Sequence, residues 1–246
     1  MSTENTAIIK IRNLYKSFGS NQVLKNFNLD LNENECVAVL GKSGSGKSVL
    51  IKCIIGLIKY EKGDINVLGK NISDLDIEEL DKIRAQVGFL FQSNALYDSM
   101  TVKENLIFPL RRHRINISET EVNKLVEEAL MSVKLPETVN MMPSELSGGM
   151  KKRIALARTL ILKPKIILYD EPTTGLDPIT SKEISNLMVE IQEKYNTSSI
   201  LISHDINCVK IVADRIVMLI DGTNYAVGTY HSLKESTDSK VLHFFD

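Results

Sequence analysis

The sequence predicts an α/β fold in which a parallel sheet carries a phosphate-binding loop, with an antiparallel β-layer beside it and an inserted α-helical segment. Three observations predict this fold. The apolar run Cys36–Leu40 leads into a glycine-rich stretch, residues 41–48, and then into a helix-like segment. A second apolar run, residues 165–169, ends in two acids. Helical signals fill residues 93–163, whereas strand and helix patterns alternate on either side.

The bulk composition narrows the possible functions. A chain of 246 residues with 43% hydrophobic content is long enough for one or two packed domains. Thirty basic and 31 acidic residues give a net charge of −1, which argues against a general nucleic-acid binder. The three cysteines, Cys36, Cys53 and Cys208, are far apart and are expected to be reduced thiols. Residues 1–6 lack a signal-peptide pattern, and no apolar run is long enough for a membrane span.

The first part of the chain predicts a β-layer beside a parallel core. Strands are expected at residues 7–12, 23–31, 36–40 and 87–91, with turns at residues 62–64 and 68–70. Capping boxes then predict two helices, one opened by Thr101 and Glu104 and the other by Ser118 and Glu121. A third helix is expected from about residue 149 to residue 162. No internal repeat is visible.

The α/β pattern resumes near residue 165. Strands are expected at residues 165–169, 198–202, 216–220 and 225–227, with helices at residues 180–195 and 206–213, the first capped by Thr180 and Glu183. We therefore expect a single domain, residues 1–246, in which residues 1–92 and 164–246 form the core and residues 93–163 form a helical subdomain. The sequence leaves open whether the tail, residues 241–246, packs on its own domain or on a second subunit.

The glycine-rich stretch matches the phosphate-loop pattern G-x-x-x-x-G-K-[ST] in full. Its glycines let backbone N–H groups turn toward an anion, and the following helix adds its positive N-terminal end. Lys47 can then reach the β- and γ-phosphates, and the Ser48 hydroxyl can coordinate Mg²⁺. A Gly/Ser turn beside an exposed lysine is the alternative, but the flanking strand and helix favour nucleotide binding. The expected phosphate-binding residues are Gly41, Lys42, Ser43, Gly44, Ser45, Gly46, Lys47, Ser48 and Val49.

Two further stretches carry candidate chemistry. Asp170 stands at the tip of an apolar strand, where it can hold Mg²⁺ through water, and Glu171 is placed to polarise an attacking water. Ser147, Gly148 and Gly149 form a turn at a predicted helix start, which is an anion site by the same argument as the phosphate loop. By themselves, the acids could simply begin a loop and the turn could be an ordinary helix cap. The phosphate loop already places one phosphate-binding helix start in this chain, and this favours a phosphate-binding role for the Ser147 turn as well.

In these residues the chain resembles the nucleotide-binding subunit of an ABC (ATP-binding cassette) transporter over essentially its whole length. Residues 41–48 resemble the family's Walker A loop, and residues 169–171 resemble its Walker B strand with the catalytic glutamate. Gln92 falls at the Q-loop, and residues 146–150 resemble the signature motif. All of these motifs come in the family's order.

The remaining motifs of the family also have counterparts. Residues 174–177, ending in Asp177, resemble the D-loop, His204 falls at the switch histidine, and Phe18 falls where the family stacks an aromatic ring on adenine. Two positions depart from the family pattern. Met150 replaces the usual glutamine of the signature, and Asn34 replaces a usual glycine, for which asparagine is the best substitute if a positive φ is required.

The resemblance implies a P-loop NTPase (RecA-like) core that binds ATP and Mg²⁺ and hydrolyses ATP. It implies catalytic roles for Glu171, His204, Gln92 and Lys47, metal contacts from Ser48, Gln92 and Asp170, and nucleotide contacts from Phe18, residues 41–49, Ser147, Gly148, Gly149 and Asp177. It also implies a head-to-tail homodimer, in which each ATP lies between one copy's Walker motifs and the other copy's signature.

The resemblance extends to one branch of the family. The stretch after Gln92, the Pro143-Ser144-Glu145 sequence before the signature, and Met150 resemble the phospholipid branch, the toluene-tolerance or maintenance-of-lipid-asymmetry systems. This implies transmembrane permease subunits and a membrane-anchored MCE-type lipid-binding protein as partners, no nucleic acid, and a peripheral location at the cytoplasmic face of the inner membrane. The alternatives are the ATPase of a lipoprotein-release or amino-acid transporter, a soluble ABC ATPase without a transport role, and a plain P-loop kinase, which the signature and His204 disfavour.

Overall fold

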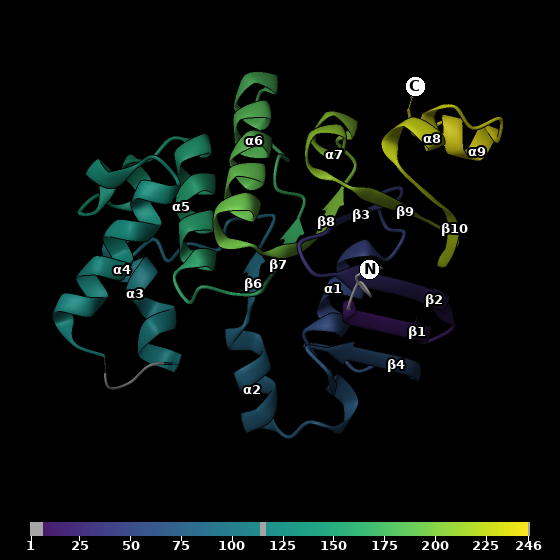
Figure 1. The fold of residues 1–246 in the computed structure, drawn as a ribbon, viewed down its shortest axis with the longest axis horizontal. Coiled ribbons are helices and arrows are strands. Elements are labelled where there is room, and N and C mark those ends of the chain that lie inside the picture. The colour runs from purple at the N-terminus through teal and green to yellow at the C-terminus, as the bar shows by residue number, and fades with distance from the viewer. Residues whose placement is uncertain (1–6, 114–116, 246) are drawn as a thin grey trace, which may run out of the picture.

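Two β-sheets share one apolar core, and helices cover the other face of the larger sheet (Figure 1). The computed structural model describes residues 7–113 and 117–245. The stretch considered for a signal peptide, residues 1–6, and the last residue of the tail, 246, lie outside the described residues. Within the described ranges, no helix has both the length and the apolarity that a membrane crossing needs.

The larger sheet has the strand order β10-β9-β3-β8-β7-β6. Its strands are parallel except for β10, which pairs antiparallel with β9 at one edge. Parallel strands end at the same edge of a sheet, so the loops after β3, β7 and β8 meet there. The bounds are β3 Cys36–Leu40, β6 Val87–Leu90, β7 Ile166–Asp170, β8 Ser198–Ser203, β9 Arg215–Ile220 and β10 Thr223–Gly228.

The smaller sheet is the predicted antiparallel β-layer, with the order β2-β1-β4-β5. Its strands are β1 Ala7–Phe18, β2 Asn21–Asn32, β4 Lys62–Val67 and β5 Lys70–Asn71. The predicted turn at residues 62–64 is wrong, because these residues lie inside β4. Gly63 there has φ +99°, and a Cβ would approach the Asn13 carbonyl oxygen to 2.4 Å. The glycine therefore serves a bulge between β1 and β4, where the register shifts, and not a turn.

Alternation along β3 shows how the two sheets share a core. Val37 and Val39 pack with the apolar face of the β-layer and with helix α1, Lys47–Ile54. Ala38 and Leu40 point to the opposite face, into the cluster that contains the helices α5, α6 and α7. These helices are α5 Gly148–Leu160, α6 Pro178–Tyr195 and α7 Ile206–Val212. Burial on both faces explains why this strand is apolar throughout.

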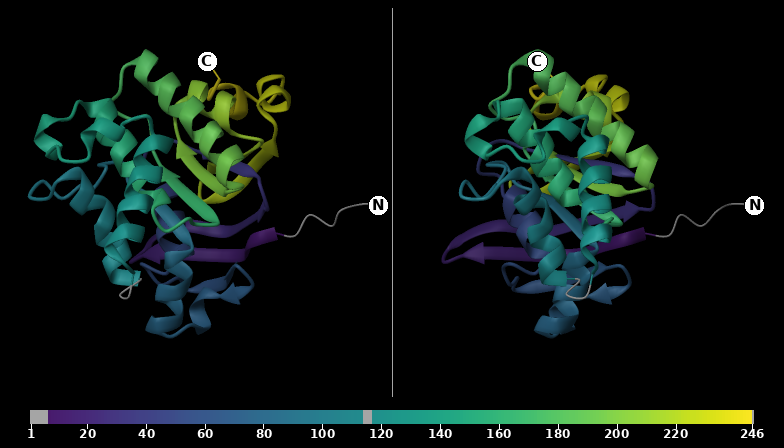
Figure 2. Two further views of the ribbon diagram at one scale, coloured as in Figure 1. Left: turned by 60° about the vertical axis from the view of Figure 1, so that its left-hand side comes forward. Right: turned by 90° about the vertical axis from the view of Figure 1, so that its left-hand side faces the viewer.

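Helices occupy the chain between β6 and β7, as predicted, and they lie together at one side of the sheet (Figure 2). They are α3 Val102–His113, α4 Glu119–Ser132 and α5, with short 3₁₀ turns at Pro136–Thr138 and Pro143–Glu145. The capping box of α3 is confirmed, because Thr101 and Glu104 each accept a hydrogen bond from the other's backbone N–H, at 2.7 and 3.2 Å. Ser118 caps α4 through the Glu121 N–H.

Three short helices were not predicted: α2 Ile77–Ala85, α8 Tyr230–Lys234 and α9 Ser239–Leu242. Helix α2 buries Ile83 and leaves Ile77 81% exposed, so its apolar periodicity is weak. Helices α8 and α9 fold the tail back onto its own chain. Val241 is buried, and the Phe245 ring meets Tyr230 edge-on at 5.5 Å between centroids. The first of the two alternatives for the tail is therefore the one observed.

Candidate functional site

The glycine-rich loop joins the end of β3 to the start of α1, as predicted. Gly44 and Gly46 have φ +77° and +104°, a conformation in which a side chain is strained. A Cβ on Gly46 would also lie 2.5 Å from Cγ1 of Val23 on β2. The loop can therefore keep its tight course past β2 only with glycine at this position.

Lys47 closes the loop on itself. Its Nζ donates hydrogen bonds to the carbonyl oxygens of Gly41 at 2.7 Å and of Lys42 at 3.1 Å. Burial lowers the pKa of Lys47, while the nearby carboxylates of Glu171 and Asp170 oppose that shift. A partly desolvated cation at the first turn of a helix is well placed to pair with an entering phosphate.

Ser48 and Asp170 meet although 122 positions separate them in the sequence. The Ser48 hydroxyl donates to Oδ1 of Asp170 at 3.0 Å. Burial raises the pKa of Asp170, and the hydrogen bond from Ser48 lowers it. One hydroxyl and one carboxylate fit Mg²⁺, which binds through few protein ligands and keeps water and phosphate oxygens around it. No cluster of three or more His, Cys, Asp or Glu side chains within residues 7–113 and 117–245 offers an all-protein metal cage.

Glu171 connects the phosphate loop to the end of β8. Its Oε2 lies 2.7 Å from Nδ1 of His204, and its Oε1 lies 4.0 Å from Nζ of Lys47. Glu171 has φ +52°, in the left-handed region, and its N–H donates to the Ile202 carbonyl oxygen at 2.9 Å. The backbone bond to β8 holds this unfavourable conformation and directs the carboxylate toward the loop.

One cavity of about 540 Å³, the site cavity, is lined by the phosphate loop, Glu171 and His204, and Asp170 is not part of its lining. This volume suits a small-molecule ligand. Phe18 belongs to its lining and is 52% exposed, and the Lys16 ammonium lies 4.9 Å from the ring centroid of Phe18. The cavity brings together residues predicted from five separate motifs; its lining comprises Phe18, Val23, Ser43, Gly44, Gly46, Lys47, Ser48, Val49, Gln92, Glu171 and His204.

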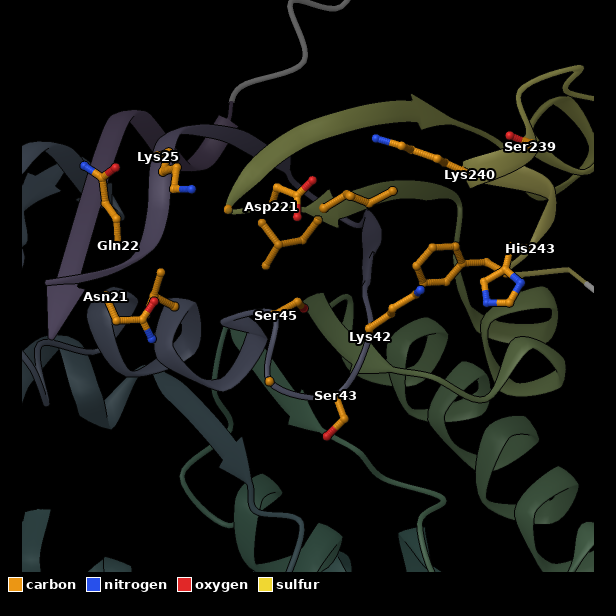
Figure 3. Close-up of a pocket in the computed structure, with 16 residues that line it drawn as sticks. Asn21, Gln22, Lys25, Lys42, Ser43, Ser45, Asp221, Ser239, Lys240 and His243 are labelled. Atoms are coloured by element: carbon orange, nitrogen blue, oxygen red, sulfur yellow. The ribbon is translucent and has the colours of Figure 1, made fainter.

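Lys42 and Ser45 line a second cavity, of about 800 Å³, on another side of the loop (Figure 3). The start of β2, the β9–β10 turn with Asp221, and helix α9 with Lys240 form its other walls. The phosphate loop is thus open on two sides. Gly41 is buried at the end of β3, where a Cβ would lie 2.7 Å from the Leu219 carbonyl oxygen.

The predicted signature residues are at a helix start but do not line the site cavity. Ser147 caps α5 by accepting a hydrogen bond from the Met150 N–H at 3.2 Å. A Cβ on Gly149 would lie 2.7 Å from Cγ2 of Thr180, so this glycine lets α5 approach the start of α6. Within one copy of the chain, therefore, the N-terminus of α1 and the N-terminus of α5 do not face a common cavity.

Asp177 is likewise outside the site cavity and caps α6. Its Oδ1 accepts hydrogen bonds from the N–H groups of Ile179 and Thr180, each at 3.0 Å. The predicted cap by Thr180 and Glu183 is wrong, because α6 begins two residues earlier, at Pro178. Proline at the first helical position lacks the N–H that a cap would have to satisfy.

Sequence reasoning missed Val23, which lines the site cavity between Phe18 and Gly46. The run Lys151-Lys152-Arg153 after the signature is typical of a solvated helix face, whereas Lys152 is only 2% exposed. Its Nζ donates to the Gln92 carbonyl oxygen at 3.0 Å, and burial lowers its pKa to about 8. The register of β2 places Val23 at the cavity, and the packing of α5 buries Lys152. A local sequence motif predicts neither the register nor the packing.

Comparison with known proteins gives consistent matches. The family described as "ABC transporter" matches residues 24–174. The intermembrane phospholipid transport system ATP-binding protein MlaF of Haemophilus influenzae is 38% identical over 98% of this chain and 90% of its own length. The methionine import ATP-binding protein MetN of Clostridium tetani is 36% identical over 93% of this chain and 70% of its own length.

A solved structure matches as well. The dimeric structure of a post-hydrolysis state of the ATP-binding cassette MJ0796, bound to ADP and Pi, superposes with a TM-score of 0.81. It is 35% identical in sequence and covers 90% of this chain and 98% of its own.

Proposed function

This chain belongs to the ABC transporter family, and we propose that it is the ATP-hydrolysing subunit of a transporter that moves phospholipid through partner membrane chains. The observation that carries the proposal is the site cavity. Lys47, Ser48, Gln92, Glu171 and His204, from four motifs, converge on it in the arrangement that phosphoryl transfer to water requires.

The mechanism begins with ATP displacing contacts within the chain. Phe18 stacks on the adenine, and the N–H groups of the phosphate loop receive the phosphates. Lys47 exchanges its bonds to the Gly41 and Lys42 carbonyl oxygens for the β- and γ-phosphate oxygens. Ser48 and Asp170, whose side chains are 3.0 Å apart, would hold Mg²⁺ together with the Gln92 side chain. When bound, Mg²⁺ neutralises charge on the phosphates.

Hydrolysis then depends on Glu171. Its carboxylate orients and polarises a water molecule in line with the γ-phosphate. His204, at 2.7 Å from this carboxylate, holds it in place and reaches the γ-phosphate side of the cavity. The burial of Glu171 limits the number of competing waters, which strengthens both interactions.

A second copy of the chain completes the site. Ser147, Gly148 and Gly149 lie outside their own site cavity, and Ser147 and Gly148 present N–H groups at the start of α5. We propose that two copies pair head to tail, so that the signature of each copy closes over the ATP of the other. Asp177 then lies near the shared interface. The dimeric cassette with ADP and Pi is a relative that supports this arrangement.

Partners and location follow from the transport role. We propose that permease subunits bind the surface around Tyr97 and Phe108, which are 42% and 40% exposed and whose ring centroids lie 4.8 Å apart. These subunits would hold the chain at the cytoplasmic face of the inner membrane, together with an MCE-type lipid-binding protein. Residues 93–163 would form the subdomain that carries both this surface and the signature.

Phospholipid is the proposed cargo because of the motif pattern around Gln92 and Met150 and the similarity to MlaF. An amino-acid transporter is the second candidate, which the similarity to MetN favours. Purification of the chain with its native membrane partners, followed by mass spectrometry of bound small molecules, separates the two. Phospholipid that co-purifies and is released by ATP supports the proposal. A bound amino acid without lipid overturns the cargo, and absence of any permease overturns the transport role.

A further inference from the structure

Helix α5 carries two cations that point into the body of the chain. Lys152, one turn after the signature, is 2% exposed, and its Nζ donates to the Gln92 carbonyl oxygen at 3.0 Å. Arg158, in the last turn, donates to the carbonyl oxygens of Asn94 at 2.8 Å and Ala95 at 2.6 Å. Neither cation has a carboxylate within 4.0 Å among the described residues, so backbone oxygens are their partners.

The loop that they hold has an unfavourable backbone conformation. Asn94 and Ala95 have φ +63° and +51°, and a left-handed conformation is disfavoured for alanine in particular. The two Arg158 bonds fall on the carbonyl groups of these two residues. A planar guanidinium that binds two successive carbonyl oxygens fixes their relative orientation, which a single ammonium cannot do. Arg158 therefore stabilises a loop conformation that the sequence does not favour by itself.

The far end of the same loop is fixed by one side chain of α3. Asn105 is fully buried, and its Nδ2 donates to the carbonyl oxygens of Tyr97, Met100 and Thr101 at 3.0–3.1 Å. Its Oδ1 accepts from the Tyr97 N–H at 2.8 Å. The loop is thus bound to α5 at its start and to α3 at its end. Between these points it presents the exposed Tyr97 ring.

We propose that Lys152 and Arg158 are positioning residues that join the loop at residues 92–97 and helix α5 into one rigid body. This inference rests on the proposed function. When a membrane partner displaces the surface at Tyr97, the displacement passes through Arg158 and Lys152 to α5, and from there to Ser147 at its start. A 13-residue helix is stiff and about 20 Å long, so it transmits the displacement without bending. Gln92 moves with it, because Lys152 holds its carbonyl oxygen.

The test compares ATP turnover by the chain alone with turnover in the complex with its membrane partners. The ratio of the two rates is the partner response. Arg158→Met and Lys152→Met should bring this ratio to within about twofold of one, while the Kd for ATP of the isolated chain stays within about twofold of wild type. The Asn94 N–H, which donates to the Phe91 carbonyl oxygen at 3.1 Å, should exchange at least about tenfold faster, since the bonds that hold the loop are lost.

Two conservative variants and one control complete the design. Lys152→Arg keeps a hydrogen-bond donor and should retain the partner response. Arg158→Lys cannot donate to both carbonyl oxygens with the geometry of a guanidinium, so its partner response should lie between those of wild type and Arg158→Met. These variants also serve if a methionine variant does not fold. Lys124→Met is the control, because Lys124 is exposed on α4 and makes no hydrogen bond or ion pair with the described residues. It should change neither the ratio nor the exchange.

Several results overturn the inference. One is an Arg158→Met variant that keeps the wild-type partner response although amide exchange in its loop becomes faster. The partner response would then not depend on the bonds between the loop and α5. Amide exchange that is unchanged in both methionine variants also overturns the inference. So does a partner response of one in the wild-type chain, because membrane partners would then not alter its ATP turnover. Each of these leaves the proposed function intact if Glu171→Gln still abolishes hydrolysis. A wild-type chain that hydrolyses no ATP, alone or with its partners, refutes the proposed function itself.

Discussion

The Glu171→Gln substitution tests the chemistry of the site most sharply, because it removes a charge and keeps the shape of the side chain. Glu171 lies 2.7 Å from His204 and 4.0 Å from Lys47, and it is the carboxylate that we assign to the attacking water. A positioned general base contributes about 10²–10⁴-fold to a rate. We therefore expect kcat to fall by about that factor, which corresponds to about 2.7–5.5 kcal/mol in the activation free energy.

Binding of ATP should not weaken in this variant. Two unit charges 4 Å apart in a partly buried site attract each other by about 4 kcal/mol before hydration offsets most of it. Glutamine removes this competing attraction, so Lys47 becomes more available to the phosphates. The Kd for ATP should be equal to that of wild type or lower by up to about tenfold, a change of about 1.4 kcal/mol.

The assay is steady-state phosphate release together with titration of a fluorescent ATP analogue. Glu183→Gln is the matched control, because Glu183 pairs with Arg153 on the surface, outside the site cavity. It should leave kcat within about twofold of wild type. The assignment of Glu171 is refuted if Glu171→Gln turns over ATP at the wild-type rate. It is also refuted if the loss of activity comes entirely from weaker ATP binding.

Three further substitutions give separate tests. Asp177→Ala removes the cap of α6 and should cost about 1 kcal/mol, which lowers the melting temperature by about 2–4 °C in calorimetry; an unchanged melting temperature would contradict the cap. Phe18→Ala should raise the Kd for ATP by about tenfold, since stacking on a base is worth about 1–3 kcal/mol, and an unchanged Kd would move the adenine elsewhere. Ser48→Ala should increase the Mg²⁺ concentration needed for half-maximal hydrolysis, and the same requirement as wild type would remove Ser48 from the metal site.

Local sequence patterns predicted most of the site, because its chemistry lies in short motifs at strand ends. The glycines of the phosphate loop and the acids at the end of β7 each follow an apolar run, and parallel strands bring their ends together. The histidine after β8 was indicated by the family resemblance alone. The contact of Ser48 with Asp170 follows from this topology. The position of Phe18 relative to the loop does not, since the hairpin of β1 and β2 sets it, and only the family resemblance pointed to it.

Features that depend on packing between distant elements were out of reach. The cap of α6 was misplaced by three residues because Thr180 and Glu183 have the spacing of a capping box, while Asp177 followed by proline begins the helix earlier. Gly63 looked like a turn residue because glycine suits both turns and bulges. Lys152 looked like a surface residue because charged side chains on a helix usually face solvent, and only the fold shows that it reaches Gln92.

The most direct test of the central claim is the mass of the Glu171→Gln chain in sedimentation velocity, with and without ATP and Mg²⁺. The chain has a mass of 27.6 kDa. We predict a species of one chain without nucleotide and of two chains with ATP, and we predict that adding Ser147→Arg to the same variant prevents the pairing while ATP still binds. A single chain at saturating ATP would contradict the account, as would pairing that Ser147→Arg leaves intact.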